Sequence, residues 1–301
     1  MNSFIFNKKL SKIFIIGASG SVGTDLFNFF EKNKYNVFGT AFKNKKKKYI
    51  YLNLNNKNKK FIKNINNKDI LIFNSAYTDK NWIEKNKEKS KKLNLDSTIN
   101  FLKEIKKINC KIIFMSSVEV FDGKIGNYKE SQNPQPISYY GKNKLLIEKF
   151  ITKNFINFTI IRTGWIVTNS MKSNRCIIVN IYKNILDNDA KLASDNFINI
   201  LSSEDLFKYI LFFLTYDKCL IMHLSSGSKI SRVKIANYIK KLSKFSKSMQ
   251  FKLIKHKDLE DHDKIPQNNY LNCELSNKIT KIKTDNLQQI LLKKIKLIEK
   301  I

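Results

Sequence analysis

The chain has 301 residues, of which 42% are hydrophobic, and its 56 Lys and Arg residues outnumber its 25 Asp and Glu residues. This length and apolar content predict one large or two modest domains with a packed core, and they exclude a disordered chain despite the net charge of +31. No apolar run approaches the roughly 18 residues of a membrane span, and the four cysteines are too widely spaced to indicate a disulfide framework or a metal site. A cytoplasmic protein without membrane contact is the expectation.

The positive charge comes almost entirely from lysine, because only Arg162, Arg175 and Arg232 are arginine. Proteins that read base edges or grip phosphates bidentately rely on arginine, whose planar fork fits those groups. The lysines are spread along the whole chain, and no helix-turn-helix, zinc or RNP pattern accompanies them. We therefore interpret the charge as a compositional bias and expect no specific nucleic-acid partner.

The N-terminal half alternates short apolar runs with helix-like segments. Strands are predicted at 12–16, 36–40, 49–54, 69–74, 111–115 and 159–162. Helices are predicted at 24–31, 84–106 and 140–153, and a lysine-rich loop at 43–48. This alternation predicts an α/β fold of the Rossmann type, with a doubly wound parallel sheet covered by helices on both faces.

Beyond about Trp165 the pattern loosens. Helices are predicted at 205–216, 231–244 and 285–301, and a strand at 219–224. The last helix carries an apolar stripe that favours packing on the domain over membrane association, formed by Leu287, Ile290, Leu291, Ile295 and Ile298. This part of the chain is expected to form a smaller, partly interwoven lobe.

Three of the nine glycines fall within seven residues, between the first predicted strand and the first predicted helix. In such a segment the first glycine permits a tight turn, the second lets the backbone approach a pyrophosphate, and the third allows the helix to pack on the strand. The N-terminus of the helix faces the anion. The segment favours a turn that binds a dinucleotide, rather than a turn without a ligand. The residues of this predicted cofactor cradle are Gly17, Ser19, Gly20, Ser21, Val22 and Gly23.

The end of the second predicted strand distinguishes NAD from NADP. An acidic residue there would bind the ribose 2′-hydroxyl of NAD, but no Asp or Glu occurs between residues 32 and 68. A carboxylate would repel a 2′-phosphate, whereas the Thr40 hydroxyl and Lys43 could bind one. NADPH is the predicted cofactor. NADH stays open, because Lys43 could belong to the general lysine background.

Tyr140 and Lys144 stand four residues apart at the start of a predicted helix, which places both side chains on one face. A neighbouring ammonium is expected to lower the pKa of the phenol from its usual value of ~10, and Lys144 can also hold the nicotinamide ribose. Ser117 follows an apolar strand at the edge where a doubly wound sheet binds ligands. It could donate a hydrogen bond to a substrate carbonyl, so the three residues together predict acid–base catalysis.

With these motifs in order, the chain resembles the extended short-chain dehydrogenase/reductase family, and within it the dTDP-4-dehydrorhamnose reductase-like sugar-nucleotide reductases. The similar segments cover nearly the whole chain: NSAYT (74–78), LNLDST (93–98), SSVEVFDG (116–123), PISYYG (136–141), IRTGW (161–165), HLSSG (223–227) and PQN (266–268). The resemblance implies that Ser117, Tyr140 and Lys144 are the catalytic triad.

The resemblance also implies roles for residues around the triad. It places Ser75, Ala76 and Tyr77 over the cofactor, together with Asn94, which supports the active site, and Asn53, where an adenine-contacting aspartate is common. It places Thr78, Glu119 and Trp165 on the substrate side, although Trp165 could equally pack in the core. Glu119 stands where the family has a substrate-contacting tyrosine, so the sugar that the family accepts does not carry over directly.

The implied function is NADPH-dependent reduction of a keto group on a nucleotide-linked deoxysugar in carbohydrate biosynthesis, with no metal and with a homodimer left open. Residues 1–165 are expected to form the NADP-binding domain, to which 197–224 return, and 166–301 mainly the substrate-binding lobe. Two alternatives remain. One is an NAD-dependent nucleotide-sugar epimerase or dehydratase, and the other is a non-catalytic NADP-binding regulatory subunit.

Overall fold

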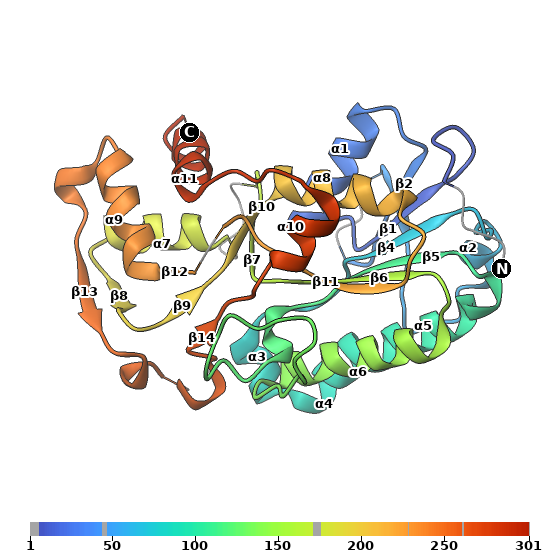
Figure 1. Ribbon diagram of the computed structural model, residues 1–301, viewed down its shortest axis with the longest axis horizontal. Helices are drawn as coiled ribbons and strands as arrows, with labels where there is room; N and C mark the ends of the chain where they lie inside the picture. The colour runs from blue at the N-terminus through green and yellow to red at the C-terminus, as the bar shows by residue number, and fades with distance from the viewer. Residues whose placement is uncertain (1–5, 44–46, 171–175, 228, 261, 301) are drawn as a thin grey trace.

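A seven-stranded, fully parallel sheet organises the larger part of the molecule (Figure 1). The computed structural model describes residues 6–43, 47–170, 176–227, 229–260 and 262–300. The strand order is β11-β6-β5-β4-β1-β2-β3. The strands are β1 (Ile13–Ile16), β2 (Val37–Ala41), β3 (Tyr49–Tyr51), β4 (Ile70–Phe73), β5 (Lys111–Met115), β6 (Phe158–Thr163) and β11 (Leu220–Leu224). The predicted doubly wound fold is confirmed. Because the order reverses between β1 and β4, a crevice opens at the carboxyl ends of these two strands.

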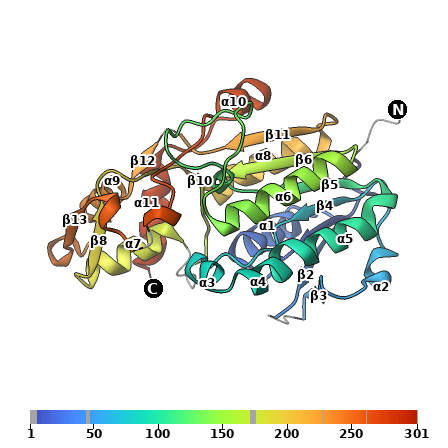
Figure 2. The same ribbon diagram turned by 90° about the horizontal axis from the view of Figure 1, so that it is seen from below.

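Helices cover both faces of this sheet (Figures 1 and 2). On one face, α1 (Ser21–Lys32) and α8 (Ser203–Thr215) pack on a core that includes Ile13 and Ile15 of β1. On the other face, α5 (Ser97–Ile105) and α6 (Tyr139–Asn154) pack with the short α2 (Lys59–Ile62) on a core that includes Phe14 and Ile16. Successive side chains of a strand point to opposite faces, and both faces are buried, so β1 is apolar throughout.

A second lobe lies beyond one end of the sheet, at the left of Figures 1 and 2. Its separate core is formed by α7 (Ile177–Leu186), α9 (Arg232–Leu242) and α11 (Leu287–Ile298), and α10 (Glu274–Thr280) leads back past β11. The lobe also holds short strands in three pairings: β7 (Trp165–Val167) with β10 (Ile200–Ser202), β8 (Ala190–Ala193) with β13 (Phe251–Ile254), and β9 (Phe197–Ile198) with β12 (Ile230–Ser231) and β14 (Asn268–Asn269).

The predicted stripe of α11 packs into this lobe, with Ile290, Leu291 and Ile295 buried. Sequence patterning missed the short strands, because two to four residues are too few to show a period, and it also missed the ten-residue α7. Although they follow β7 to β10 in the chain, α8 and β11 return to the main sheet. Within the described ranges, no helix combines the length and apolar character that a membrane span requires.

The single long helix predicted over 84–106 is wrong. The segment breaks into α3 (Lys80–Lys85), α4 (Lys87–Ser90), a π-helical turn over Lys91–Asp96, and α5. Asn86 separates α3 from α4 with a non-helical φ of −130°, and its side-chain amide donates to the Trp82 carbonyl at 3.0 Å. An asparagine that hydrogen-bonds the nearby backbone competes with the helix in this way.

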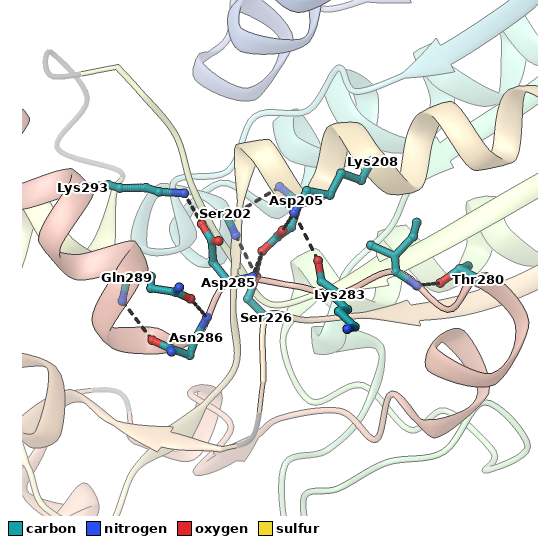
Figure 3. Close-up of polar contacts among 11 residues, drawn as sticks. Ser202, Asp205, Lys208, Ser226, Thr280, Lys283, Asp285, Asn286, Gln289 and Lys293 are labelled. Atoms are coloured by element: carbon teal, nitrogen blue, oxygen red, sulfur yellow. Dashed lines mark hydrogen bonds and ion pairs between the residues drawn. The ribbon is translucent and has the colours of Figure 1, made fainter.

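The C-terminal segment is fastened to α8 through the buried carboxylate of Asp205 (Figure 3). Its Oδ2 accepts from the Ser226 hydroxyl at 2.8 Å and from the Asp285 N–H at 3.0 Å, and its Oδ1 accepts from Lys208 Nζ at 2.8 Å. Burial by itself would raise the pKa of Asp205, but these hydrogen bonds lower it below its usual value. Asp285 leads directly into the Asn286 cap of α11, so this carboxylate ties the last helix to the main domain.

Candidate active site

One cavity of about 800 Å³ runs along the carboxyl edge of the main sheet into the second lobe. Its volume lies within the range of small-molecule sites, about 300–1,000 Å³. The predicted residues that line it come from both parts of the molecule: Gly20, Ser21, Val22, Ala76, Thr78, Ser117, Glu119, Tyr140, Lys144 and Trp165. The fold therefore brings the predicted cofactor cradle, catalytic triad and substrate-side residues to one space.

The glycine turn connects β1 to α1 at the topological switch point. Gly17 has a φ of +88°, and a Cβ there would lie 2.8 Å from the Ser75 Cα at the end of β4. A Cβ on Gly23 would lie 2.8 Å from the Ala18 Cα and closer still to the Gly17 carbonyl oxygen. These two positions therefore require glycine, Gly17 for the conformation of the turn and Gly23 for the close approach of α1 to the backbone after β1. A Cβ on Gly20 would lie no nearer than 3.5 Å to any other group, so packing within the protein does not require glycine at this position. Contact of Gly20 with a phosphate stays a prediction.

The structure corrects the role predicted for Thr40. Its hydroxyl is buried, accepts from the Gly17 N–H at 3.1 Å and donates to the Ile15 carbonyl at 3.4 Å. The hydroxyl therefore braces the glycine turn and is not free to bind a 2′-phosphate. Lys43 is exposed just after β2, and residues 44–46 of the predicted loop at 43–48 lie outside the described residues.

Two predicted asparagines hold backbone in place. Asn94, in the π-helical turn, accepts from the Tyr77 N–H at 2.7 Å and donates to the Tyr77 carbonyl at 2.8 Å, which fixes the segment that follows β4. Asn53 accepts from the Asn55 N–H at 3.1 Å in a turn, and it is not among the residues that line the cavity. Asn94 thus supports the site through Tyr77.

Ser117, Tyr140 and Lys144 all line the cavity, Ser117 just after β5 and the other two near the start of α6. Ser117 is buried, and its Oγ accepts from the Glu119 N–H at 3.2 Å. Lys144 Nζ is buried, donates to the Met115 carbonyl at 2.8 Å and lies 5.7 Å from the centroid of the Tyr140 ring. The predicted trio is therefore assembled around the cavity wall.

The ionisation of Tyr140 differs from the prediction. Burial, followed by the charge of Glu119, raises the pKa of its phenol well above the usual range. Lys144, whose ammonium donates to the Met115 carbonyl, does not reverse this rise. Burial lowers the pKa of Lys144 to about 8. Tyr140 accordingly keeps its proton, which suits a proton donor.

Glu119 is a buried carboxylate with partners on two elements. It forms an ion pair with Lys80 of α3, and its Oε2 accepts from the Ser138 hydroxyl at 3.0 Å. The Ser138 Oγ in turn accepts from the Gly141 N–H at 3.1 Å, which caps α6. Lys80 Nζ also lies 5.5 Å from the centroid of the Trp165 ring. Contacts through Lys80 and Glu119 therefore connect Trp165 to the first turn of α6.

A second buried charge pair joins two of the elements around the triad. Glu148 of α6 accepts from Arg162 of β6 through Nη2 at 2.7 Å and through Nε at 3.1 Å, and Ser116 donates to the same carboxylate. Bidentate pairs of this kind are geometrically specific. The pair locks α6 to β5 and β6 next to Ser117 and Lys144.

Sequence reasoning missed several polar residues of the cavity, among them Lys80, Asn180, Lys191, Arg232 and Lys264. Four of these are lysine or asparagine, which are so abundant here that no local pattern marks them. The rarity of arginine was the one signal that could have drawn attention to Arg232.

Comparison with known proteins agrees with this architecture. The family model described as the RmlD substrate binding domain matches residues 11–299. The chain belongs to the RmlD family. The family resemblance inferred from the motifs is thereby confirmed.

Among solved structures, the RmlD-family chain is similar to a hypothetical dTDP-4-dehydrorhamnose reductase from Sulfolobus tokodaii, with 27% identity and a TM-score of 0.77 over 91% of this chain and 96% of that one. The dTDP-4-dehydrorhamnose reductase of Bacillus anthracis in complex with NADP shares the fold, with a TM-score of 0.77 and 18% identity over 94% of this chain and 96% of that one.

The curated proteins add a different relative. Methionine adenosyltransferase 2 subunit beta of Bos taurus is 28% identical over 152 residues, which are 50% of this chain and 46% of that protein. The RmlD-family chain thus spans about half the length of the curated relatives that it first matches.

Proposed function

We propose that this protein is an NADPH-dependent reductase of a keto group on a nucleotide-linked deoxysugar, similar to dTDP-4-dehydrorhamnose reductase. The observation that carries the proposal is the single cavity that joins the glycine turn to Ser117, Tyr140 and Lys144. The reductase names of the Sulfolobus tokodaii and Bacillus anthracis structures, and the NADP in the second, support it. In this proposal residues 1–165, joined by 197–224, bind the cofactor, and 166–301 mainly bind the sugar nucleotide.

The residues present fit a dinucleotide. The backbone at Gly20 is open to the cavity, and the N-terminus of the twelve-residue helix α1 faces the same space. When bound, NADPH supplies the hydride for a carbonyl carbon. The exposed ammonium of Lys43 is the residue that would pair with its 2′-phosphate.

Side chains of the protein stabilise and then protonate the negative charge that develops on the carbonyl oxygen. Ser117 Oγ donates a hydrogen bond to that oxygen, and Tyr140 transfers its phenolic proton to the oxygen as negative charge develops there. The raised pKa of Tyr140 keeps this proton in place at neutral pH. Lys144, with a pKa of about 8, is mostly protonated and stabilises the phenolate that remains.

The test is NADPH oxidation over a panel of dTDP- and UDP-linked 4-keto sugars. Tyr140→Phe should lower turnover by about 10²–10⁴-fold, the usual contribution of a positioned acid, while NADPH still binds. Tyr139→Phe is the matched control, because Tyr139 precedes it on α6 and is not among the cavity-lining residues. Full activity of the Tyr140 variant would refute the assignment.

The similarity to methionine adenosyltransferase 2 subunit beta favours a second candidate, a non-catalytic NADP-binding regulatory subunit. It predicts that NADPH binds but that no keto sugar of the panel is reduced. It also predicts that the protein changes the kinetics of a methionine adenosyltransferase catalytic subunit when the two are mixed. The assembled triad favours the reductase, and the panel assay separates the two.

A further inference from the structure

Two buried charges hold residues 168–170, the segment after β7 through which the chain crosses into the second lobe and which we call the crossover. Asp25 lies on α1, and its Oδ2 accepts from the Asn169 N–H at 2.7 Å. Lys294 lies on α11, and its Nζ donates to the Thr168 carbonyl at 2.7 Å and to the Ser170 carbonyl at 3.0 Å. Asp25 is 8% exposed and Lys294 is 2% exposed.

The two charges bind opposite ends of one peptide group. The Thr168 carbonyl and the Asn169 N–H belong to the same peptide unit, and in a trans peptide these two groups point in opposite directions. The ammonium therefore approaches the crossover from the side of α11, and the carboxylate approaches it from the side of α1. Hydrogen bonds to charged groups are stronger than those between neutral groups, so the peptide cannot rotate without losing two strong bonds.

Burying these two charges costs free energy that packing alone does not require. Burial raises the pKa of Asp25 and lowers the pKa of Lys294, and in each case the charge of the other residue opposes the shift. Glu204, in the first turn of α8, adds a second negative charge that acts on both groups. Apolar side chains of similar volume would stabilise a core as well as a buried ion pair or better. The charges are therefore explained by the polar backbone that they hold.

The crossover forms part of the cavity wall next to the cofactor helix. Thr168 is buried and lines the cavity, as do Ser21 and Val22 in the first turn of α1. Asp25 lies about one turn further along α1 than Ser21. Its bond to Asn169 therefore places the crossover beside the end of α1 that faces the cavity. This is the end of the helix that the glycine turn precedes.

The helix that carries Lys294 is itself fastened to the main domain. The Asp285 N–H, just before α11, donates to the buried Asp205 carboxylate of α8, and Lys293 forms an ion pair with Asp285 (Figure 3). Lys293 is exposed, whereas its neighbour Lys294 is buried and bonded to the crossover. The anchored start of α11 thus holds the Lys294 ammonium in place on the second-lobe side of the crossover.

We propose that Asp25 and Lys294 are positioning residues for the cofactor, which hold the Thr168–Asn169 peptide as one wall of the NADPH site and thereby strengthen NADPH binding. The proposal rests on the proposed function, because it takes NADPH as the ligand of the glycine turn. Neither Asp25 nor Lys294 is among the cavity-lining residues, so both act through the crossover. The last helix of the chain then contributes to cofactor affinity without touching the cofactor.

The test combines two measurements in a Trp82→Phe parent, in which Trp165 of β7 is the sole tryptophan. NADPH fluorescence titration gives the Kd, and the anisotropy of Trp165 emission without ligand reports how firmly the crossover is held. Lys294→Met should raise the Kd of NADPH by about tenfold, in line with the loss of charge-assisted hydrogen bonds, and should lower the anisotropy. Lys294→Arg keeps the charge and the donors and should restore both. Lys296→Met, which removes an exposed cation of the same helix, is the matched control.

An unchanged Kd or an unchanged Trp165 anisotropy in Lys294→Met would overturn the inference, and so would an equal rise in Kd in Lys296→Met. A role in stability alone predicts a lower melting temperature with an unchanged Kd, which counts against the proposal in the same way. If Lys294→Met does not fold, Asp25→Asn combined with Lys294→Met replaces it, because no uncompensated charge then stays buried, and the same rise in Kd is expected.

The failure of this inference differs from the failure of the proposed function. If Lys294→Met binds NADPH as its parent does and both reduce a keto sugar, the inference is refuted and the reductase stands. If the parent and the wild type bind no NADPH, the proposed function is refuted and the inference falls with it.

Discussion

Substitution of Gly20 or of Gly23 by alanine distinguishes the contribution of the glycine turn to NADPH binding from its contribution to the stability of the fold. In Gly23→Ala the new Cβ would lie 2.8 Å from the Ala18 Cα and 3.0 Å from the Gly17 carbonyl carbon, and these backbone atoms belong to the turn that follows β1. Overpacking of this kind costs up to about 3 kcal/mol, and the helix preference of Ala over Gly returns about 1 kcal/mol. We expect a net loss of about 2 kcal/mol in the free energy of unfolding.

Gly20→Ala should behave in the opposite way. Its Cβ would lie 3.5 Å from the Gly17 carbonyl oxygen, an ordinary contact, and its φ of −74° suits any residue. The free energy of unfolding should fall by only about 0.5 kcal/mol, because Ala caps a helix less well than Gly. The methyl group stands on the cavity lining, where the backbone must approach the pyrophosphate. We expect NADPH binding to weaken at least about tenfold, a change of about 1.4 kcal/mol.

Urea unfolding followed by circular dichroism measures the first effect, and NADPH fluorescence titration measures the second. The two variants are each other's control, because both add one methyl group within four residues of the same turn. The reasoning is refuted if Gly23→Ala is as stable as the wild type, or if Gly20→Ala binds NADPH with an unchanged Kd.

Two further predictions concern buried carboxylates. Asp205→Asn should lower the free energy of unfolding by about 2–3 kcal/mol at neutral pH. The folded pKa of Asp205 lies below its usual 3.8, so the difference in stability between wild type and variant should be constant above that pH and shrink below it. If urea unfolding shows a difference that stays constant down to the lowest pH, the network in Figure 3 is contradicted. Glu119→Gln should lower the pKa of Tyr140, so this phenol should ionise at lower pH in a tyrosinate-absorbance titration that uses Tyr140→Phe as its reference. Glu84→Gln, in the same cavity, should leave that titration unmoved, and equal shifts in both would disprove the role of Glu119.

Much of the main domain could be predicted because its signals are local. The strands are buried on both faces and therefore appear as unbroken apolar runs such as Ile13–Ile16. The glycine turn and the Tyr140–Lys144 pair each lie within one turn of helix or loop, so their spacing predicts their geometry. The order of these motifs also led to the correct family.

The predictions failed where distant segments decide the local structure. The π-helical turn interrupts an apparently continuous helix and places Asn94 against the Tyr77 backbone, 17 residues earlier in the chain. The Thr40 hydroxyl turned inward because the Gly17 N–H, which lies after a different strand, needed an acceptor.

By itself, the sequence determined the parallel sheet, the glycine turn and the order of the candidate catalytic residues, because periodicity and motif spacing act over a few neighbouring residues. Only the tertiary structure decided the electrostatics of the site. The Lys80–Glu119 pair joins α3 to the short helical turn after β5, and Arg232 of α9 contacts the ring of Trp165. Such contacts depend on how packed elements meet, and in a chain this rich in lysine no local pattern marks the residues that make them.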